Sequence, residues 1–353
     1  MVTSWWVWHE RVSILVAEFT DKALPTPFKR EVCHESRPLR PFRSPRGSQG
    51  RRGAAVPREG EVLVRVRTAG VNFFEVLMRA NRYAVTPELP IIPGVEVAGV
   101  VEAIGEGVDS AVIGARVAVP LFALGRGEGY AEYVAVPGAS VISIPDALSF
   151  ETAVALMVQG LTALHMVRQA LPRDKTVLVH AGAGGVGSLL VQLAKREGAG
   201  SVIATASSEK KRSLSRRLGA DAAIDYTAEG WQETLCKMAP VDLIYDTIGG
   251  EVTRASLAAL APGGELVFAA LGRFRLEVAD LNSLFEKNQT LKGFALLPLL
   301  SATLADDLSA LFSLAVSGAL IVAKGASFPL DRAADAHRAI ESRGVSGKVV
   351  LVP

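Results

Sequence analysis

The sequence predicts an α/β protein of two domains, and three observations support this prediction. The chain has 353 residues, more than one hydrophobic core normally supports. Its composition of 49% hydrophobic, 21% charged and 6% aromatic residues is typical of a soluble α/β protein. After about Leu161, closely spaced strands give way to short apolar strands that alternate with amphipathic helices. We therefore expect a β-rich domain followed by a doubly wound parallel sheet.

The β-rich part begins at Glu61 with "EVLVRVRTAGV", which alternates apolar and polar residues at the two-residue period of a half-buried strand. Further strands are expected within residues 94–105, 115–122 and 130–145. Because glycine and proline separate these segments closely, we expect a compact and mostly antiparallel sheet.

The second part contains five short strand candidates: "KTVLVHAG", "SVIATAS", "DAAIDY", "VDLIYDTIGG" and "GGELVFAALG". Each is apolar enough to be covered on both faces, and strands of that kind joined by helices form a parallel sheet. The last segment, "FPLDRAADAHRAIESRGVSGKVVLVP", predicts a helix and a strand that return to the first domain.

A glycine-rich loop joins the first of these strands to a helix. Gly182, Gly184 and Gly187 satisfy the pattern GxGxxG, in which backbone N–H groups and the positive end of a helix dipole hold a pyrophosphate. The alternative is a plain strand-to-helix turn. The residues expected to contact a dinucleotide here are Gly182, Gly184, Gly185, Val186 and Gly187.

The choice of dinucleotide depends on the end of the next strand, "VIATASSEKKR". An NAD site presents an acid there, but this chain has Ser207 and Ser208, followed by Lys210, Lys211 and Arg212. Hydroxyl groups and cations bind a 2′-phosphate that a carboxylate would repel. We therefore expect NADPH, with Ser207 and Lys211 as contacts, although the lysines could simply solvate a helix start.

Residues 34–58 carry seven arginines and four prolines, with Glu35 as the single acid. Such a segment buries too little apolar surface to offset its ordering entropy, so we expect a divergent N-terminal arm over residues 1–59. A solvated linker is favoured over a tract that binds RNA or an acidic surface.

Charge and cysteine content limit the compartment and the partners. A net charge of +2 favours neither nucleic acid nor a membrane as a partner. Cys33 and Cys236 cannot form a disulfide framework and have no metal-ligand spacing. The longest apolar stretch, residues 308–324, is shorter than the ~20 residues that span a bilayer. Because the N-terminus also lacks the features of a signal peptide, we expect a cytoplasmic protein.

Six segments together resemble the medium-chain dehydrogenase/reductase superfamily, in its zinc-independent NADPH:quinone oxidoreductase branch. The resemblance covers about Gly60 to Pro353 and implies a homodimer. It also implies a GroES-like catalytic domain, residues 60–164 and 296–353, interrupted by a Rossmann domain, residues 165–295. The segments are "GEVLVRVRTAGVN", "PGVEVAGVVEAIGEGV", "YAEYV", "QGLTA", "VLVHAGAGGVG" and "GKVVLVP".

The resemblance also implies that the site holds no metal. The superfamily's zinc alcohol dehydrogenases need an early cysteine, a His-Glu pair and a four-cysteine lobe, but this chain has Asn72 and Val95 at the first two places and no lobe. We expect hydride transfer from NADPH to a quinone or an α,β-unsaturated carbonyl compound, with enoyl-thioester reduction as a neighbouring possibility. The alternative is a non-catalytic NADPH-binding protein, crystallin-like or in contact with RNA.

Two catalytic residues are carried over from the family. Tyr83 resembles the tyrosine that delivers a proton in related enoyl-thioester reductases; the alternative is an aromatic wall, with protons coming from water. Asn72 resembles an asparagine beside the nicotinamide and the substrate oxygen, or else stabilises its loop.

Other residues resemble cofactor contacts of the family, although each could equally be structural. Thr162 corresponds to a hydroxyl near the nicotinamide amide, and Tyr226 to a side chain beside the adenosine phosphate. Leu271 and Gly272 correspond to the turn under the nicotinamide, and Lys348 to a residue near the phosphates. His165 and His180 are weak catalytic candidates, because a lone histidine is more often packed or hydrogen-bonded.

Overall fold

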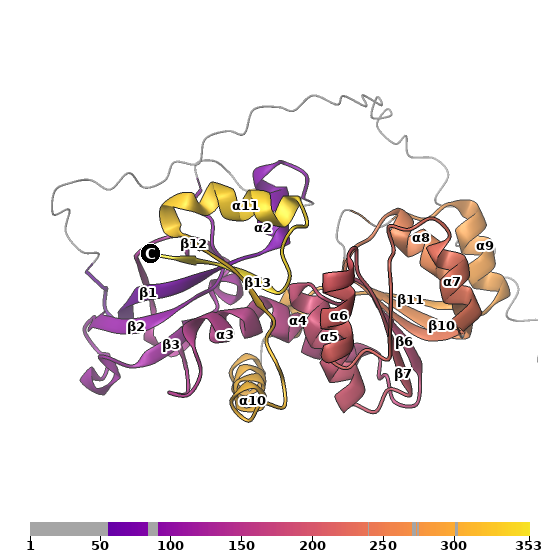
Figure 1. Ribbon diagram of the computed structural model, residues 1–353. Helices are drawn as coiled ribbons and strands as arrows, with labels where there is room; N and C mark the ends of the chain where they lie inside the picture. Colours follow the sequence, from indigo (N-terminus) through magenta and orange to yellow (C-terminus); the bar gives the residue numbers. More distant parts are fainter. Residues whose placement is uncertain (1–55, 84–90, 239, 270–272, 274, 301–302) are drawn as a thin grey trace, which may run out of the picture. The chain divides into compact units, whose positions relative to one another are not determined.

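The computed structural model describes residues 56–83, 91–238, 240–269, 273, 275–300 and 303–353 (Figure 1). Most of the expected N-terminal arm, residues 1–59, lies outside the described residues. The expected cofactor contacts Leu271 and Gly272 lie outside them as well.

The first sheet has seven strands and is mostly antiparallel, as the sequence predicts. The strand order is β12-β13-β1-β2-β3-β5, β4 also pairs with β1, and the pair β12–β13 is parallel. In Figure 1 the C-terminal strands, in yellow, lie beside β1, in indigo. The strands are β1 (Glu61–Val71), β2 (Val97–Ile104), β3 (Arg116–Val119), β4 (Tyr133–Pro137), β5 (Ile142–Ser143), β12 (Lys324–Pro329) and β13 (Lys348–Val352).

The second sheet has six parallel strands in the order β11-β10-β9-β6-β7-β8. The order reverses between β6 and β9, so the predicted doubly wound sheet is confirmed. Its strands are β6 (Thr176–Val179), β7 (Ser201–Thr205), β8 (Ala222–Ile224), β9 (Val241–Asp246), β10 (Leu260–Phe268) and β11 (Thr290–Gly293).

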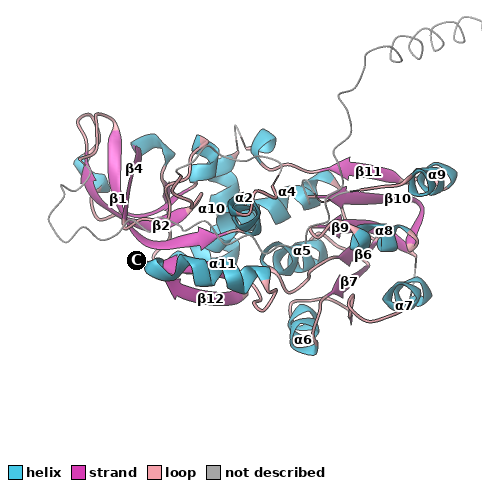
Figure 2. Ribbon diagram, turned by 90° about the horizontal axis from the view of Figure 1, so that it is seen from above, coloured by secondary structure: helices cyan, strands magenta, loops and turns pink. Residues whose placement is uncertain are grey.

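Helices cover both faces of this second sheet (Figure 2). Val177 and Val179 of β6 pack into a core with α4 and α5, whereas Leu178 packs into a core with α7, α8 and α9. The strands are therefore apolar on both faces, which is typical of a parallel sheet. The helices along this half are α4 (Leu161–Gln169), α5 (Gly185–Arg196), α6 (Glu209–Arg217), α7 (Trp231–Met238), α8 (Glu251–Leu257), α9 (Val278–Glu286) and α10 (Leu304–Val316).

The chain passes from the first sheet to the second between β5 and β6, and returns between β11 and β12. The expected domain boundaries, 164/165 and 295/296, fall inside these two connections. Their exact positions stay predictions. The helices α2 (Phe73–Arg79) and α11 (Ala333–Glu341) pack on each other beside the first sheet.

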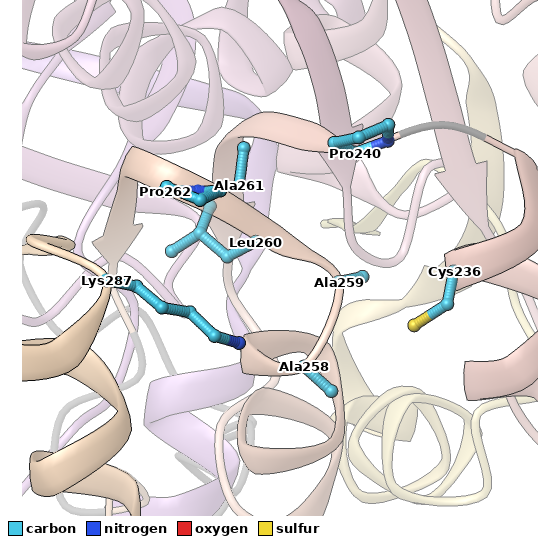
Figure 3. Close-up of a pocket in the computed structure, with 8 residues that line it drawn as sticks. All are labelled: Cys236, Pro240, Ala258, Ala259, Leu260, Ala261, Pro262 and Lys287. Carbon is cyan, nitrogen blue, oxygen red and sulfur yellow. The ribbon is translucent and has the colours of Figure 1, made fainter.

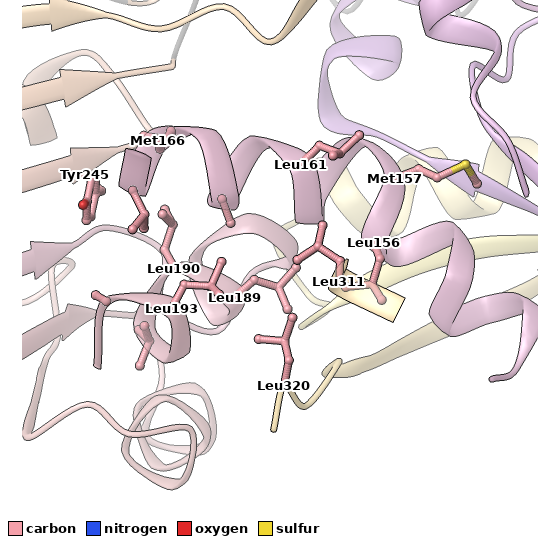
Figure 4. Close-up of a cluster of buried hydrophobic side chains, with 14 of the residues drawn as sticks. Leu156, Met157, Leu161, Met166, Leu189, Leu190, Leu193, Tyr245, Leu311 and Leu320 are labelled. Atoms are coloured by element: carbon pink, nitrogen blue, oxygen red, sulfur yellow. The ribbon is translucent and has the colours of Figure 1, made fainter. Parts of the chain in front are cut away.

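A continuous helical run links the two sheets: α3 (Phe150–Ala155), the π-helical segment η4 (Leu156–Gly160) and α4. Figure 4 shows its fully buried Leu156, Leu161 and Met166 packed with residues of α5 and α10, such as Leu189 and Leu311. Each such side chain stabilises the fold by about 1.5–3 kcal/mol. The run is long and apolar enough to cross a membrane, but most of it is buried inside the protein, as in a core helix.

Candidate functional site

The glycine-rich loop lies between β6 and α5, and its backbone is held by two hydrogen bonds. The N–H of Gly182 donates to the carbonyl of Thr205 at 2.9 Å, and the N–H of Gly184 donates to the carbonyl of Ala181 at 2.7 Å. In the part of the chain that the structure describes, no side chain caps the start of α5, whose N-cap residue is Gly184. The first N–H groups of this helix are therefore available to an anion.

The glycines are needed because other atoms lie where a Cβ would be. At Gly187 a Cβ would lie 2.2 Å from the carbonyl oxygen of Ala181, so this glycine lets the helix pack on the strand. At Gly182 it would lie 2.7 Å from the Cβ of Ala204. At Gly185 it would meet the side chain of Gln159 in η4 at 2.1 Å.

His180, directly before the loop, is fully buried and hydrogen-bonded on both ring nitrogens. Its Nδ1 lies 3.0 Å from Thr205 Oγ1, and its Nε2 lies 2.8 Å from Ser256 Oγ. Burial lowers the pKa of His180, which favours the neutral ring. These contacts tie the end of β6 to β7 and α8, directly before the glycine-rich loop.

A basic cluster lies beside the start of α6. Ser208 caps this helix and accepts from the N–H of Lys211. The ammonium group of Lys211 donates to the carbonyl of Arg343, and Arg343 Nη1 donates to the hydroxyl of Tyr226 at 3.3 Å. The structure thus brings together the predicted contacts Lys211 and Tyr226. Ser207 follows β7, at the end of the sheet that carries the loop.

Within the described part of the chain, neither Lys211 nor Arg343 pairs with a carboxylate, whereas Arg212 is bound by Glu209 and Asp225. Burial and the neighbouring Arg343 lower the pKa of Lys211. Two cations that repel each other and have no paired acid are suited to an anion. We call Lys211, Tyr226 and Arg343 the basic cluster.

Arg343 was not predicted from the sequence. It lies after α11, in the connection that leads to β13, and it has a positive φ of 54°. No motif marks it, and its distance from Lys211 along the chain hides the contact. The only signal was a basic residue in the closing segment that returns to the first sheet.

The same connection attaches to the glycine-rich loop. The N–H of Gly347 donates to the carbonyl of Ala183 at 3.0 Å, and Gly347 forms a parallel bridge with Gly184. At Gly347, whose φ is +64°, a Cβ would lie 2.1 Å from the carbonyl oxygen of Ala323, so this position requires glycine. The loop is therefore held by the residue that directly precedes β13 of the other sheet.

Next to this attachment lies a buried polar network around Glu96. The ammonium group of Lys348 donates to Glu96 Oε1 and, at 2.8 Å, to Asn72 Oδ1. Asn72 Nδ2 donates to Glu96 Oε1 at 2.9 Å and to Glu75 Oε2 at 3.2 Å. Glu96 Oε2 accepts from the N–H of Val158 in η4 at 2.8 Å. All four side chains, from Asn72, Glu75, Glu96 and Lys348, are buried.

This network bears on two residues carried over from the family. Both polar atoms of the Asn72 amide are engaged inside the protein, which agrees with a loop-stabilising amide. The ammonium group of Lys348 is paired with Glu96 and not directed to the glycine-rich loop. The expected roles of Asn72 beside a substrate oxygen and of Lys348 near the cofactor phosphates stay predictions.

Glu75 is the second carboxylate of the network. Its oxygens accept from the N–H groups of Asn72 and Gly94, each at 2.9 Å. Burial, with the nearby charge of Glu96, raises the pKa of Glu75 to about 7, although these hydrogen bonds and the charge of Lys348 oppose the shift. Glu75 therefore changes protonation state near neutral pH.

Tyr83 follows α2 and is half-buried. Its ring centre lies 5.7 Å from that of Phe74, and burial raises its pKa above the ordinary phenol value. Among the described residues, the Tyr83 hydroxyl has no hydrogen-bond partner. Thr162, half-buried in the first turn of α4, lies three residues after Gln159. The roles of Tyr83 and Thr162 stay predictions.

A shallow pocket of about 220 Å³ lies away from these residues, between α7, α8 and β10 (Figure 3). Its lining is mostly small and apolar, with Cys236 and Lys287 as the polar exceptions. None of the predicted site residues lines it, and we assign it no role in the chemistry.

Two domain families match the chain. Residues 58–146 match the alcohol dehydrogenase GroES-like domain, and residues 185–313 match a zinc-binding dehydrogenase domain. These ranges contain most of the first sheet and most of the parallel sheet.

Whole proteins match over most of their length. The quinone oxidoreductase of Pseudomonas aeruginosa is 34% identical over 312 residues, which are 85% of this chain and 93% of the relative. The 2-haloacrylate reductase of a Burkholderia species is 33% identical over 315 residues, which are 84% of this chain and 92% of the relative. The structure of the Thermus thermophilus quinone oxidoreductase, solved also with NADPH, matches with a TM-score of 0.72 and 34% identity. The match covers 84% of this chain and 93% of the Thermus chain.

The buried network predicts a pH-dependent stability. Because the pKa of Glu75 is raised from 4.5 to about 7 in the fold, the free energy of unfolding should fall as pH rises from 4.5 through 7. The Glu75 contribution amounts to about 3 kcal/mol over that range. In Glu75→Gln this part of the pH dependence should vanish, as measured by urea denaturation at several pH values. The exposed Glu106→Gln is the control, and an unchanged slope in Glu75→Gln would contradict the assignment.

Proposed function

The chain belongs to the quinone oxidoreductase branch of the medium-chain dehydrogenase/reductase superfamily, and on this premise we propose that it is an NADPH-dependent reductase. Its acceptors are quinones or α,β-unsaturated carbonyl compounds, and it needs no zinc. The single observation that carries the cofactor assignment is the basic cluster of Lys211, Tyr226 and Arg343, which lies beside the dinucleotide loop without a paired acid.

The glycine-rich loop fits a pyrophosphate. The close contacts at Gly182, Gly185 and Gly187 fix the path of the loop, and the uncapped first turn of α5 presents N–H groups at the positive end of the helix dipole. The attachment of Gly347 to Ala183 holds the loop in place.

The basic cluster fits the 2′-phosphate of NADPH. Lys211 and Arg343 supply positive charge, and the hydroxyl groups of Tyr226 and Ser207 supply donors of the kind that phosphate oxygens accept. A carboxylate in this place would bind the free ribose hydroxyl of NADH instead and repel the phosphate. The residues therefore favour NADPH over NADH.

Bound NADPH supplies the hydride, and the protein must orient the acceptor and deliver a proton. Tyr83 is the proposed donor, because a phenol is protonated at neutral pH and its hydroxyl has no hydrogen-bond partner among the described residues. Asn72 is a positioning residue, since its amide is held by Glu75, Glu96 and Lys348. It fixes the start of α2, from which Tyr83 follows.

Zinc independence is supported by the residues of the buried network. No group of three histidine, cysteine, aspartate or glutamate side chains in the described chain could hold a metal ion. The ammonium group of Lys348 already lies against Glu96, where it repels a further cation. A quinone or an enone accepts hydride at carbon or oxygen without a Lewis acid of that kind.

We further propose a homodimer. Three large apolar side chains lie exposed on α9, Val278, Leu281 and Phe285, with exposed fractions of 73%, 52% and 85%. The neighbouring β11 is an edge strand of the parallel sheet. An apolar helix face next to an unpaired strand edge is suited to a second copy of the chain.

We also propose that the protein works in the cytoplasm on a small molecule. The described cysteine, Cys236, is a free thiol, which suits a reducing compartment. The charge balance of +2 does not favour nucleic acid as a partner.

The cofactor assignment is tested with Arg343→Ala. Loss of a charge-assisted hydrogen bond to phosphate should weaken NADPH binding about 10- to 100-fold and leave NADH binding within about twofold. Fluorescence titration of both dinucleotides measures this, with the exposed Arg217→Ala on α6 as the control. Equal losses for NADPH and NADH would overturn the assignment. Tight NADPH binding without NADPH oxidation by a quinone or a short enone would show a non-catalytic protein.

The proton donor is tested with Tyr83→Phe. Turnover of a short enone should fall about 100-fold at saturating NADPH, while the dissociation constant of NADPH stays unchanged. Steady-state absorbance at the NADPH band measures turnover, and the surface variant Tyr133→Phe is the control. Unchanged turnover in Tyr83→Phe would mean that water supplies the proton and that Tyr83 is only a wall of the pocket.

The dimer is tested with Phe285→Asp, which places a charge in the proposed interface. Light scattering should show a dimer for the natural chain and a monomer for the variant. The control is Ile113→Asp. Ile113 is exposed, caps the C-terminal end of the 3-10 helix η1 (Ser110–Val112) and lies far along the chain from α9. A monomeric natural chain, or a variant that remains dimeric, would reject this interface.

A further inference from the structure

Arg273 is a half-buried cation that the proposed cofactor contacts do not use. Its guanidinium carbon lies 4.9 Å from the centre of the Phe73 ring, the first residue of α2. Its Nη2 donates to the carbonyl of Thr247 at 2.9 Å, and its Nε is buried and has no hydrogen-bond partner among the described residues. The side chain therefore lies against the start of α2, next to Asn72.

No acid among the described residues pairs with Arg273. The carboxylate charge that acts on Arg273 is that of Asp246, which raises the pKa of Arg273. The Asp246 oxygens accept from the N–H groups of Ile248 and Gly249 and from the hydroxyl of Thr253. Burial is the main cause that lowers the pKa of Arg273, and the like charges of Arg343 and Arg82 lower it further. Arg273 therefore has no directly bound anion among the described residues, although the charge of Asp246 partly compensates its own.

The anionic groups of NADPH already have partners in the proposed function. The start of α5 accommodates the pyrophosphate, and the basic cluster accommodates the 2′-phosphate. Arg273 lies instead against Phe73, whose neighbour Phe74 contacts Tyr83. Its free N–H thus belongs to the side of the site where the acceptor is reduced.

We infer that Arg273, with the exposed Arg82 at longer range, forms a site for the carboxylate of the acceptor, which makes α,β-unsaturated carboxylates a substrate class of this protein. This inference rests on the proposed reductase function and adds a class of acceptor to it. A guanidinium group binds a carboxylate through parallel N–H···O bonds and holds it in a defined orientation.

The carboxylate site also has a chemical role in the reduction. The β-carbon of the substrate gains the hydride that NADPH supplies, the C=C π bond breaks, and its electron pair moves onto the carboxylate. A proton then adds at the α-carbon, so one alkene, one NADPH and one proton give the saturated acid and NADP⁺. Arg273 stabilises the charge that accumulates on the carboxylate oxygens. Because a carboxylate withdraws electrons weakly, a 2-substituent that withdraws electrons is needed as well.

The test compares a 2-substituted acrylate with its methyl ester, which has nearly the same shape and no charge. The natural chain should reduce the acid with a higher kcat/KM than the ester. Arg273→Gln should lower kcat/KM about 10- to 100-fold for the acid and change it less than about threefold for the ester. Arg273→Lys should recover part of the loss. Arg275→Gln, an exposed arginine two residues away, is the matched control.

The possible results separate the inference from the proposed function. Two results in Arg273→Gln would overturn the inference, because they would show that the guanidinium contacts the cofactor. These are an equal loss of kcat/KM for acid and ester, or a higher dissociation constant for NADPH. Reduction of quinone or ester without reduction of the acid by the natural chain would overturn it too, while the proposed function stands. No reduction of any acceptor would reject both. If Arg273→Gln does not fold, Arg82→Gln should still lower kcat/KM for the acid alone, by about threefold.

Discussion

The buried ion pair between Lys348 and Glu96 connects the segments on which the site depends. The two residues are 4% and 0% exposed, and burial of each charge costs several kcal/mol. The protein tolerates this cost because Asn72 and the N–H of Val158 complete the hydrogen bonds of the pair. Loss of one partner would leave a buried charge uncompensated, which destabilises a fold by about 3–5 kcal/mol. The pair therefore acts as a geometric constraint that joins β13 and η4 to the residues directly before β2 and α2.

The constraint reaches the cofactor loop through two neighbouring residues. Gly347, before Lys348, bonds the loop at Ala183, and Gln159, after Val158, fills the space that a side chain at Gly185 would occupy. The short connection before β13 also supplies Arg343 to the basic cluster. One closing segment thus completes the first sheet, holds the loop of the second and contributes charge to the cofactor site. Through these contacts the closing segment fixes the glycine-rich loop and the start of α2 relative to each other, on either side of the proposed acceptor.

Sequence reasoning predicted the parts of the site that depend on neighbours along the chain. The strand, glycine-rich loop and helix around Gly182–Gly187 follow from a local pattern, and the structure shows why Gly187 has no side chain. Lys211 and Tyr226 were predicted as cofactor contacts, and the structure brings them together through Arg343. The engagement of Asn72 and Lys348 with Glu96 was not predicted, because these residues come from three distant segments. The placement of Leu271 and Gly272 lies outside the described residues.

The sequence by itself determined the order of strands and helices, the two kinds of sheet and the dinucleotide loop. Hydrophobic periodicity and glycine spacing record backbone geometry over a few residues, so they can be read without knowledge of distant contacts. Only the tertiary structure decided which polar groups face each other: Lys348 and Glu96, Arg343 and Tyr226, Arg273 and Phe73. Those pairs depend on how the sheets return and pack. Charge pairing acts through space, and the chain brings these partners together only when it is folded.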